Sequence, residues 1–223
     1  MLTQTELKDF LLSKGVSDVG FCRVDGDGVG GLCHAISIVV RLSDAIVDEI
    51  TTGPTPTYFN HYRTVNAFID RCLLETGLLL QQNGYRYITV AASQSMPSTP
   101  FNGRYSHKAA ARMSGLGSIG KNSLFLHEKY GARVRLGTVF TDFEVERDRE
   151  MPADPCIGCD RCKNACPSGA ILGGEWHEGV SREEIFAPAV CSEYMKKAFQ
   201  HIGRGAVCGV CMRVCPAAGA ADR

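Results

Sequence analysis

Eight of the eleven cysteines fall in the last third of the chain and repeat at short intervals. The first run reads C-x2-C-x2-C-x3-C-P, and a second reads C-x2-C-x3-C-P, with Cys191 upstream to supply its missing member. This spacing is typical of two 4Fe–4S clusters, in which the fourth cysteine of a run ligates the other cluster. We therefore expect one cluster on Cys156, Cys159, Cys162 and Cys215, and the other on Cys166, Cys191, Cys208 and Cys211.

Two other chemistries could use so many thiols. A pair of zinc knuckles is possible because C-x2-C units also hold zinc, but zinc requires neither the third cysteine nor the Cys-Pro endings. A disulfide framework needs an oxidising compartment, and the N-terminus MLTQTELKDF shows no secretory signal. Iron–sulfur binding is therefore favoured. Cys22, Cys33 and Cys72 lie outside the runs and are expected to be buried thiols that pack as small apolar side chains.

A glycine-rich segment from Gly115 to Lys121 contains two phosphate-binding patterns, G-x-G-x-x-G and G-x-x-x-x-G-K. The first requires a preceding strand and a following helix, whereas a helical segment precedes it here. The second requires Ser or Thr after the lysine, and position 122 is Asn. Nucleotide binding is disfavoured. The glycines are expected to bring the backbone close to a ligand or cluster, with a plain turn as the alternative.

The elements that must position these residues can be read from local patterns. Thr3 and Glu6 have capping-box spacing, which predicts a helix that ends at Gly15. A long apolar stripe that includes Tyr58 and Tyr62 predicts a second helix, and we expect these tyrosines to be core residues rather than substrate contacts. Strands are predicted over 16–24, 35–42, 85–92 and 134–141, and helices over 55–82 and 107–114.

The order of these elements predicts the fold class. Strands alternate with helices up to residue 145, which indicates an α+β fold (an α/β sheet domain). A charged, proline-containing linker then leads into a segment rich in Cys, Gly and Pro. We predict a sheet domain over 1–150 and a bacterial ferredoxin-like domain with two 4Fe–4S clusters over 151–223.

Charge and hydropathy exclude some classes of partner. The 24 Lys and Arg residues balance the 24 Asp and Glu residues. The chain therefore has no excess of positive charge, which disfavours a role as a general nucleic-acid binder. No apolar run approaches the roughly 20 residues of a membrane span. We therefore expect a cytoplasmic protein without a membrane partner.

The order of the motifs resembles the epoxyqueuosine reductase family. The matching features are HKAAARMSGLGSIGKN, then RLGTVFTD, then the two cysteine runs. The family consists of cobalamin-dependent enzymes with two 4Fe–4S clusters, related to reductive dehalogenases. The resemblance implies electron flow from an external donor, reduced ferredoxin or flavodoxin, through the clusters to cobalamin in the 1–150 domain. It also implies that the corrinoid is lined by Gly115, Leu116, Gly117, Ser118, Ile119, Gly120 and Lys121.

Two departures from the family pattern bear on the substrate. Where family members have an Asp before the glycine segment, this chain has Gln94, which cannot donate a titratable proton at pH 7. We expect His107, with Lys108, to be the proton donor instead; alternatively, Ser106 caps the helix and His107 merely begins it. The family's helical segment that helps hold tRNA does not follow the last cysteine, so we expect tRNA not to bind tightly.

Three functional hypotheses follow. The first is a cobalamin-dependent reductase of an unidentified small-molecule substrate. The second is a ferredoxin-like electron-transfer protein without a substrate of its own, and the third is an activator that reduces the corrinoid of a partner enzyme. The roughly 150 residues that precede the cysteine runs favour a ligand site, and so the first and third hypotheses.

Overall fold

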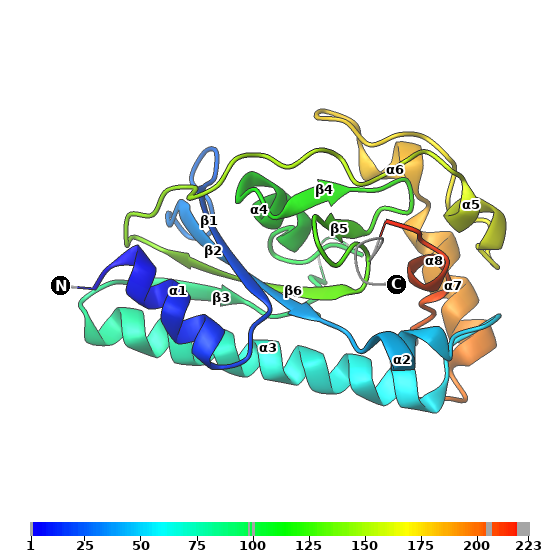
Figure 1. Cartoon of the computed structure of the whole chain (residues 1–223), viewed down its shortest axis with the longest axis horizontal. Helices are drawn as coiled ribbons and strands as arrows, with labels where there is room; N and C mark the ends of the chain where they lie inside the picture. The colour runs from blue at the N-terminus through cyan, green and yellow to red at the C-terminus, as the bar shows by residue number, and fades with distance from the viewer. Residues whose placement is uncertain (1, 98, 100, 204–206, 218–223) are drawn as a thin grey trace. The chain divides into compact units, whose positions relative to one another are not determined.

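The computed structural model describes residues 2–97, 99, 101–203 and 207–217 (Figure 1). The chain forms two compact units that are interleaved in sequence. Unit 1 comprises Met1–Arg41, Val65–Leu116 and Arg135–Pro152, and unit 2 comprises Leu42–Thr64, Gly117–Val134 and Ala153–Arg223. Two segments that the sequence analysis assigned to the sheet domain thus cluster with the cysteine-rich tail. The division into domains at residue 150 stays a prediction.

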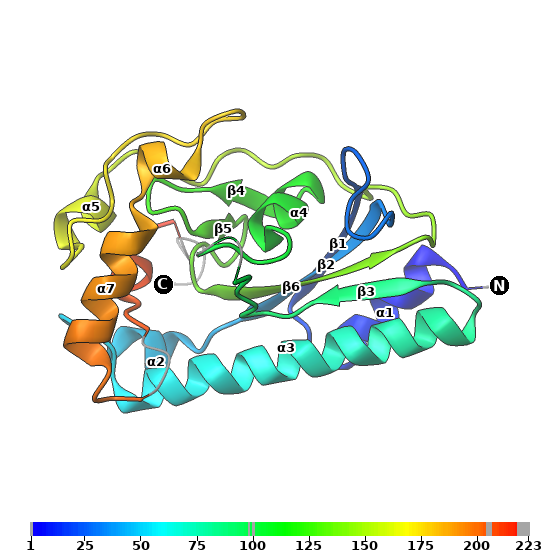
Figure 2. The same ribbon diagram turned by 180° about the vertical axis from the view of Figure 1, so that it is seen from behind.

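A four-stranded sheet forms the centre of unit 1. Its strands are β1 (Asp18–Arg23), β2 (His34–Arg41), β6 (Val134–Thr141) and β3 (Tyr87–Val90), in that spatial order (Figure 2). β1 pairs with β2 and β3 with β6, both antiparallel, with Phe21 opposite Ile36 and Ile88 opposite Phe140. The four predicted strands and the α+β fold class are confirmed.

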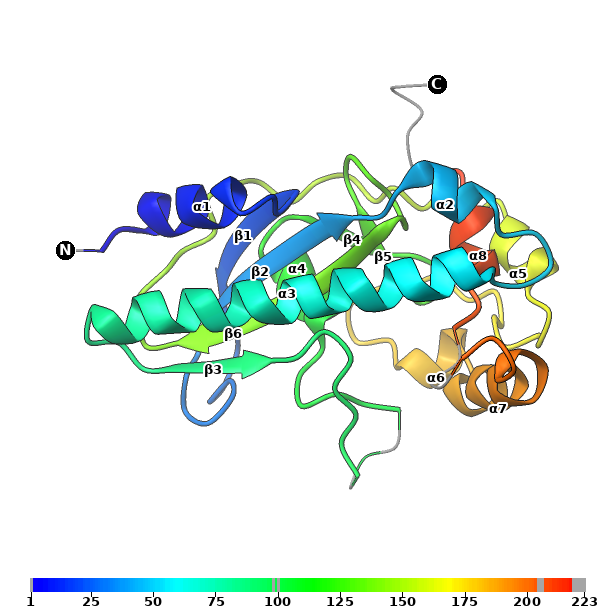
Figure 3. The same ribbon diagram turned by 90° about the horizontal axis from the view of Figure 1, so that it is seen from below.

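Helices cover this sheet. α1 (Gln4–Ser13) begins at the predicted capping box, in which Thr3 Oγ1 accepts from the Glu6 N–H at 3.2 Å and Glu6 Oε2 accepts from the Thr3 N–H at 2.8 Å. α3 (Pro56–Gln82) extends over 27 residues, close to the predicted 55–82. Figure 3 shows α3 running along the sheet. The absence of a side chain at Gly137 on β6 leaves room for Ile69 and Leu73 of this helix.

One part of the apolar core of unit 1 lies between the sheet and α4 (His107–Met113), which packs against β1 and β2. Burial of these side chains is the main favourable contribution to folding of the unit. Two of the three cysteines outside the runs join this core, one of them only partly buried. The cluster of buried side chains consists of Cys22, Val24, Val29, Leu32, Ala35, Val90, Ala110 and Phe140, with Cys33, Ile88, Tyr105 and Met113 partly buried against it.

Ahead of the cysteine-rich tail, unit 2 contains a helix and a pair of strands that the sequence patterns did not predict. One is the short helix α2 (Asp44–Asp48). The other is an antiparallel pair of three-residue strands, β4 (Gly117–Ile119) and β5 (Phe125–His127), where a turn was expected. The cysteine-rich tail adds α5 (Arg161–Ala165), α6 (Arg182–Ile185), α7 (Pro188–Phe199) and α8 (Val210–Arg213). Of these, α5 and α8 pack together.

Over the described residues, the helices lack a segment that is long and apolar enough to cross a membrane. The longest, α3, is interrupted by charged side chains such as Arg63, Asp70 and Arg71. The predicted cytoplasmic location stays a prediction.

Candidate metal centre

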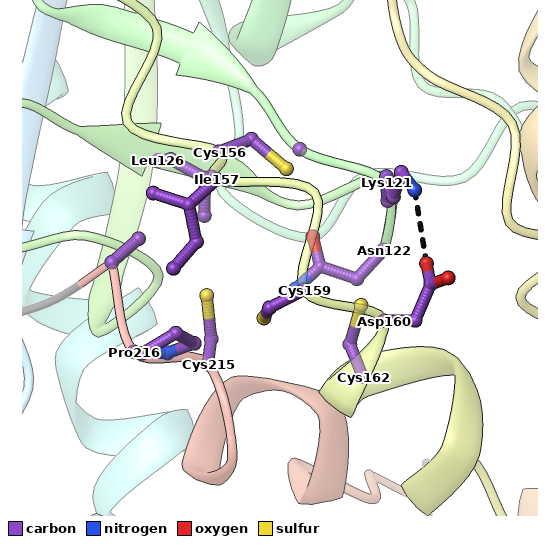
Figure 4. A pocket seen from close by; sticks show the side chains of 12 residues that line it. Lys121, Asn122, Leu126, Cys156, Ile157, Cys159, Asp160, Cys162, Cys215 and Pro216 are labelled. Carbon is purple, nitrogen blue, oxygen red and sulfur yellow. Dashed lines mark hydrogen bonds and ion pairs between the residues drawn. The ribbon is translucent and has the colours of Figure 1, made fainter.

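The first set of predicted cluster ligands surrounds a single cavity in unit 2. Cys156, Cys159, Cys162 and Cys215 all line it, and Figure 4 shows their sulfur atoms around the same space. Cys162 lies in α5, whereas Cys215 follows α8. The last cysteine of the second run thus lines the same cavity as three cysteines of the first run. This arrangement supports the predicted crossover, in which each run contributes one ligand to the cluster of the other.

The second set is brought together by α5, α7 and α8. Burial, and then the neighbouring thiols of Cys208 and Cys166, raise the pKa of Cys191 to about 11. Burial also raises the pKa of Cys211, and so do the thiols of Cys208, Cys191 and Cys166. Such effects between thiols act at short range. Helix α5, which Cys166 caps, also packs against α8, which carries Cys211. Cys162 of the first set lies in α5 and Cys211 of the second set lies in α8, so the contact between these helices makes the two sets neighbours within unit 2.

The motif that carries these thiols bears on whether they hold a cluster or a single ion. The third cysteine of the first run and the two Cys-Pro endings are typical of 4Fe–4S runs, and zinc requires none of them. A zinc ion with bonds of about 2.3 Å would draw its four sulfur ligands to one point. A 4Fe–4S cluster takes one thiolate on each of four irons and keeps its ligands further apart. The donor set therefore fits two 4Fe–4S clusters better than two zinc ions.

Two of the helices that carry predicted ligands, α5 and α8, start after a residue with left-handed backbone. These residues are Asp160 before α5, at φ 55°, and Gly209 before α8, at φ 82°. A Cβ on Gly209 would lie 2.6 Å from Ile50 Cδ1 and 2.9 Å from the Tyr58 ring, so glycine is required there. Tyr58 is 2% exposed, with its hydroxyl 3.9 Å from Met212 Sδ, which confirms it as a core residue.

Lys121 also lines the first cavity. Its side chain is 10% exposed, and Nζ lies 2.9 Å from Asp160 Oδ1 and 3.8 Å from Glu175 Oε1. The ion pair with Asp160 raises the pKa of Lys121 and lowers the pKa of Asp160. The family resemblance implies that Lys121 lies near the corrinoid, whereas no sequence pattern indicates a role for Asp160. No local signal links Asp160 to a lysine 39 residues earlier.

The glycine segment packs against the protein itself. A Cβ on Gly117 would clash with the backbone of Leu126 on β5, and one on Gly115 would meet the side chain of Arg149. Helix α4 precedes the segment and strand β5 follows it, which is the reverse of a dinucleotide-binding turn. The corrinoid-lining role of residues 115–121 stays a prediction, and these contacts do not add support to it.

His107 is held inside unit 1. Its Nδ1 lies 2.8 Å from Thr138 Oγ1 and its Nε2 lies 3.1 Å from the Ala91 carbonyl oxygen. Since a carbonyl only accepts, Nε2 carries the hydrogen, and in the neutral ring Nδ1 accepts from the Thr138 hydroxyl. Burial lowers the pKa of His107, although the Ala91 carbonyl opposes this effect. Ser106 Oγ accepts from the Ala109 N–H at 3.3 Å and caps α4.

These contacts bear on the predicted proton donors. His107 does not simply begin the helix, because its ring joins β6 to the segment after β3. Lys108 is half-buried beside it, and Gln94 is exposed. The proton-donor role of His107 and Lys108 stays a prediction.

Of the three cysteines outside the runs, two are buried as the sequence predicts and one is not. Cys22 and Cys72 are 3% and 2% exposed, which confirms them as packing residues, whereas Cys33 is half-buried. Cys22 Sγ lies 3.5 Å from the Ala110 carbonyl oxygen, and burial raises the pKa of both Cys22 and Cys72. All eleven cysteines are free of disulfides.

Comparison with known families identifies the cysteine-rich tail. Residues 155–218 match the family described as the 4Fe-4S double cluster binding domain. All eight predicted ligands lie within the matched residues. This match confirms the predicted two-cluster domain and the 4Fe–4S cofactor class.

Comparison with whole proteins extends the similarity beyond the tail. The epoxyqueuosine reductase of Listeria monocytogenes is 31% identical over 130 residues, which cover 54% of this chain and 32% of that reductase. The match thus spans about a third of the length of this curated relative.

Solved structures show the same relationship at the level of the fold. A reductive dehalogenase, whose structure suggests a mechanism for B12-dependent dehalogenation, superimposes with a TM-score of 0.76 at 17% identity and covers 95% of this chain and 31% of its own. An epoxyqueuosine reductase with an epoxyqueuosine-modified tRNA-Tyr stem loop superimposes with a TM-score of 0.55 at 19% identity and covers 75% of this chain and 52% of its own. The chain is therefore similar in sequence to epoxyqueuosine reductases and shares its fold with them and with reductive dehalogenases.

Proposed function

We propose that this chain is a reductase that relays electrons through two 4Fe–4S clusters to a bound cobalamin and from there to a substrate. One observation supports the proposal: within the two-cluster domain, Cys215 of the second run lines the same cavity as Cys156, Cys159 and Cys162 of the first run, as the proposed crossover requires. Two neighbouring clusters provide a path for single electrons. A reduced ferredoxin or flavodoxin is the proposed external donor.

The order of the two clusters follows from what lines the first cavity. Gly120, Lys121 and Asn122 border the cavity of the first cysteine set. Gly120 and Lys121 belong to the segment that the family resemblance places near the corrinoid. We therefore assign the cluster on the first set to the acceptor side and the cluster on the second set to the donor side.

Cobalamin is proposed from the fold that this chain shares with a B12-dependent dehalogenase. Bound cobalamin would supply a cobalt centre that takes up single electrons and forms bonds to carbon. The chain's own contribution is to hold the clusters and to exclude water from them. Tyr58 at 2% exposure and Met212 at 5% exposure do so beside the second run.

The proposed substrate is a small molecule rather than a tRNA. One structural relative holds a tRNA stem loop. In this chain, however, 24 basic residues are matched by 24 acidic ones. Because phosphate contacts by Lys and Arg supply most non-specific affinity for nucleic acids, a neutral chain is a weak tRNA binder.

The test begins with anaerobic purification and assays of iron, sulfide and zinc. We expect about eight iron atoms per chain, four for each cluster. Two zinc ions with no iron would overturn the proposal. Hydroxocobalamin is then added, and gel filtration removes the corrinoid that the protein does not bind. The visible absorption of the bound corrinoid is measured before and after addition of reduced ferredoxin.

The same experiment separates the alternatives. Retained and reduced corrinoid supports the reductase, whereas loaded clusters without retained corrinoid favour a ferredoxin-like electron-transfer protein. Reduction of corrinoid on an added partner, without retention, favours the activator. Parallel reactions with a halogenated phenol and with an epoxyqueuosine-modified tRNA stem loop separate the two substrate classes, and submicromolar binding of the stem loop at physiological salt would overturn the small-molecule assignment.

A further inference from the structure

A buried cation borders the cavity of the first cysteine set. Lys121 contributes to the lining together with Cys156, Cys159, Cys162 and Cys215 (Figure 4). Its side chain is 10% exposed, so water screens its charge only weakly. A positive charge in such surroundings acts on its neighbours more strongly than one on the surface.

Asp160 is arranged to hold this cation in place. It lies between Cys159 and Cys162 with φ 55°, a left-handed conformation that a non-glycine residue adopts at an energetic cost. It occupies the N-cap position of α5, yet its side chain makes no capping hydrogen bond. Its carboxylate instead contacts Lys121 Nζ at 2.9 Å. Asp160 therefore adopts an unfavourable backbone conformation and does not cap α5. Its carboxylate instead holds the Lys121 ammonium group beside the cysteines.

The carboxylates near Lys121 offset its charge only in part. The Asp160 side chain is 46% exposed and Glu175 is 79% exposed, so solvent screens both carboxylates more than it screens Lys121. Lys163, the next lysine along the run, is exposed and is absent from the residues that line the cavity. Lys121 is thus a poorly screened charge at the first cluster position.

We propose that Lys121 raises the reduction potential of the cluster held by the first cysteine set. This inference rests on the ligand assignment in the proposed function. The cluster takes up one electron without forming or breaking a bond, so its net charge becomes more negative by one. A nearby positive charge stabilises the reduced form more than the oxidised form, and net charge is one of the determinants of cluster potential.

The test uses the holoprotein and a dithionite titration followed by electron paramagnetic resonance. The first cluster is identified as the one whose signal changes in Cys159→Ser. Lys121→Gln should shift its midpoint to more negative potential and leave the second cluster unchanged. We expect at least a tenfold change in the ratio of reduced to oxidised cluster at a fixed potential, or about 59 mV for one electron. Lys163→Gln removes the same charge from outside the cavity and should have a much smaller effect.

A second variant separates an electrostatic role from a structural one. Asp160→Asn removes the negative partner and should shift the first midpoint to more positive potential, opposite to Lys121→Gln. The double variant should return towards the wild-type value. A purely structural tether predicts shifts in the same direction, because either substitution breaks the same ion pair.

Three results would overturn the inference: no shift in Lys121→Gln, equal shifts in Lys121→Gln and Lys163→Gln, or shifts of the same sign in Lys121→Gln and Asp160→Asn. About eight irons and two signals in these variants would leave the proposed function standing. If Lys121→Gln does not load its cluster, Asp160→Asn decides alone: a positive shift supports the inference, and a negative or absent shift overturns it.

Discussion

Asp48 Oδ1 accepts a hydrogen bond from Arg133 Nη2 at 2.8 Å, and Arg133 is only 3% exposed. The same carboxylate oxygen lies 3.2 Å from Nε of Arg213, which belongs to the helix between Cys208 and Cys215. Arg133 also pairs with Asp44 at 3.0 Å, while its Nε has no hydrogen-bond partner among the residues that the structure describes. Helix α2 thus supplies the carboxylates for a buried cation and anchors the second cysteine run.

Removing Asp48 should therefore destabilise the protein strongly. Asp48→Ala leaves Arg133 with one carboxylate partner in place of two, and loss of a partner from a buried charge costs roughly 3 kcal/mol. We expect this decrease in the free energy of unfolding in anaerobic denaturant titrations. Arg71→Ala is the control, because its pair with Glu75 is 78% exposed on the arginine side and should contribute less than about 1 kcal/mol. Equal losses in the two variants would contradict the role of Asp48.

Gly209 should tolerate no side chain. Gly209→Ala adds a Cβ that clashes with Ile50 and Tyr58 in a left-handed conformation. Gly84 has almost the same backbone angle, φ 86° against 82°, with open space around it. Gly84→Ala should cost about 1 kcal/mol from conformation alone, whereas Gly209→Ala should cost more and reduce the iron content. Equal unfolding free energies and full iron content in both variants would show that the close packing at Gly209 is dispensable.

The cysteine crossover predicts which cluster each substitution damages. Cys215→Ser should alter the same resonance signal as Cys159→Ser, although Cys215 belongs to the second run. Cys166→Ser should alter the signal that Cys208→Ser alters. Cys33 lies outside the cysteine runs, so Cys33→Ser should leave both cluster resonance signals and the iron content unchanged. If Cys215→Ser pairs with Cys208→Ser instead, the crossover is wrong.

His107 should make stability depend on pH. Burial holds the pKa of His107 below its ordinary value of about 6.5, so the unfolded chain binds more protons than the folded chain just below that pH. The free energy of unfolding should therefore fall as the pH decreases below about 6.5. His107→Gln removes the titrating group, so its stability should decline less between pH 7 and pH 5.

Denaturant titrations of the two holoproteins at pH 7, 6 and 5 test this prediction. The pKa of His61 is also lowered by burial, but His61 is present in both proteins and its contribution cancels. If the free energy of unfolding changes with pH by the same amount in the wild type and in His107→Gln, protonation of His107 is not linked to folding.

The sequence predicts those parts of the molecule whose signals are local. The capping box at Thr3 fixes the start of α1, and apolar periodicity defines α3. The cysteine spacing predicts both sets of ligands because it reflects the geometry of a cluster. The β4 and β5 strands were missed because three-residue strands carry almost no periodic signal. The pairs Lys121–Asp160 and Arg133–Asp48 join residues 39 and 85 positions apart, and no local pattern encodes such pairs.

The interleaving of the two units has a consequence for how the cysteine-rich tail can be used. Ile50 and Tyr58 contact Gly209, and Gly53 contacts Phe199, so residues 42–64 pack against the second cysteine run. We therefore expect the cysteine-rich tail not to fold as an independent ferredoxin when it is excised or fused to another protein. During synthesis, residues 42–64 leave the ribosome well before the cysteines that they contact. The cluster sites can therefore form only after Cys208, Cys211 and Cys215 have been synthesised.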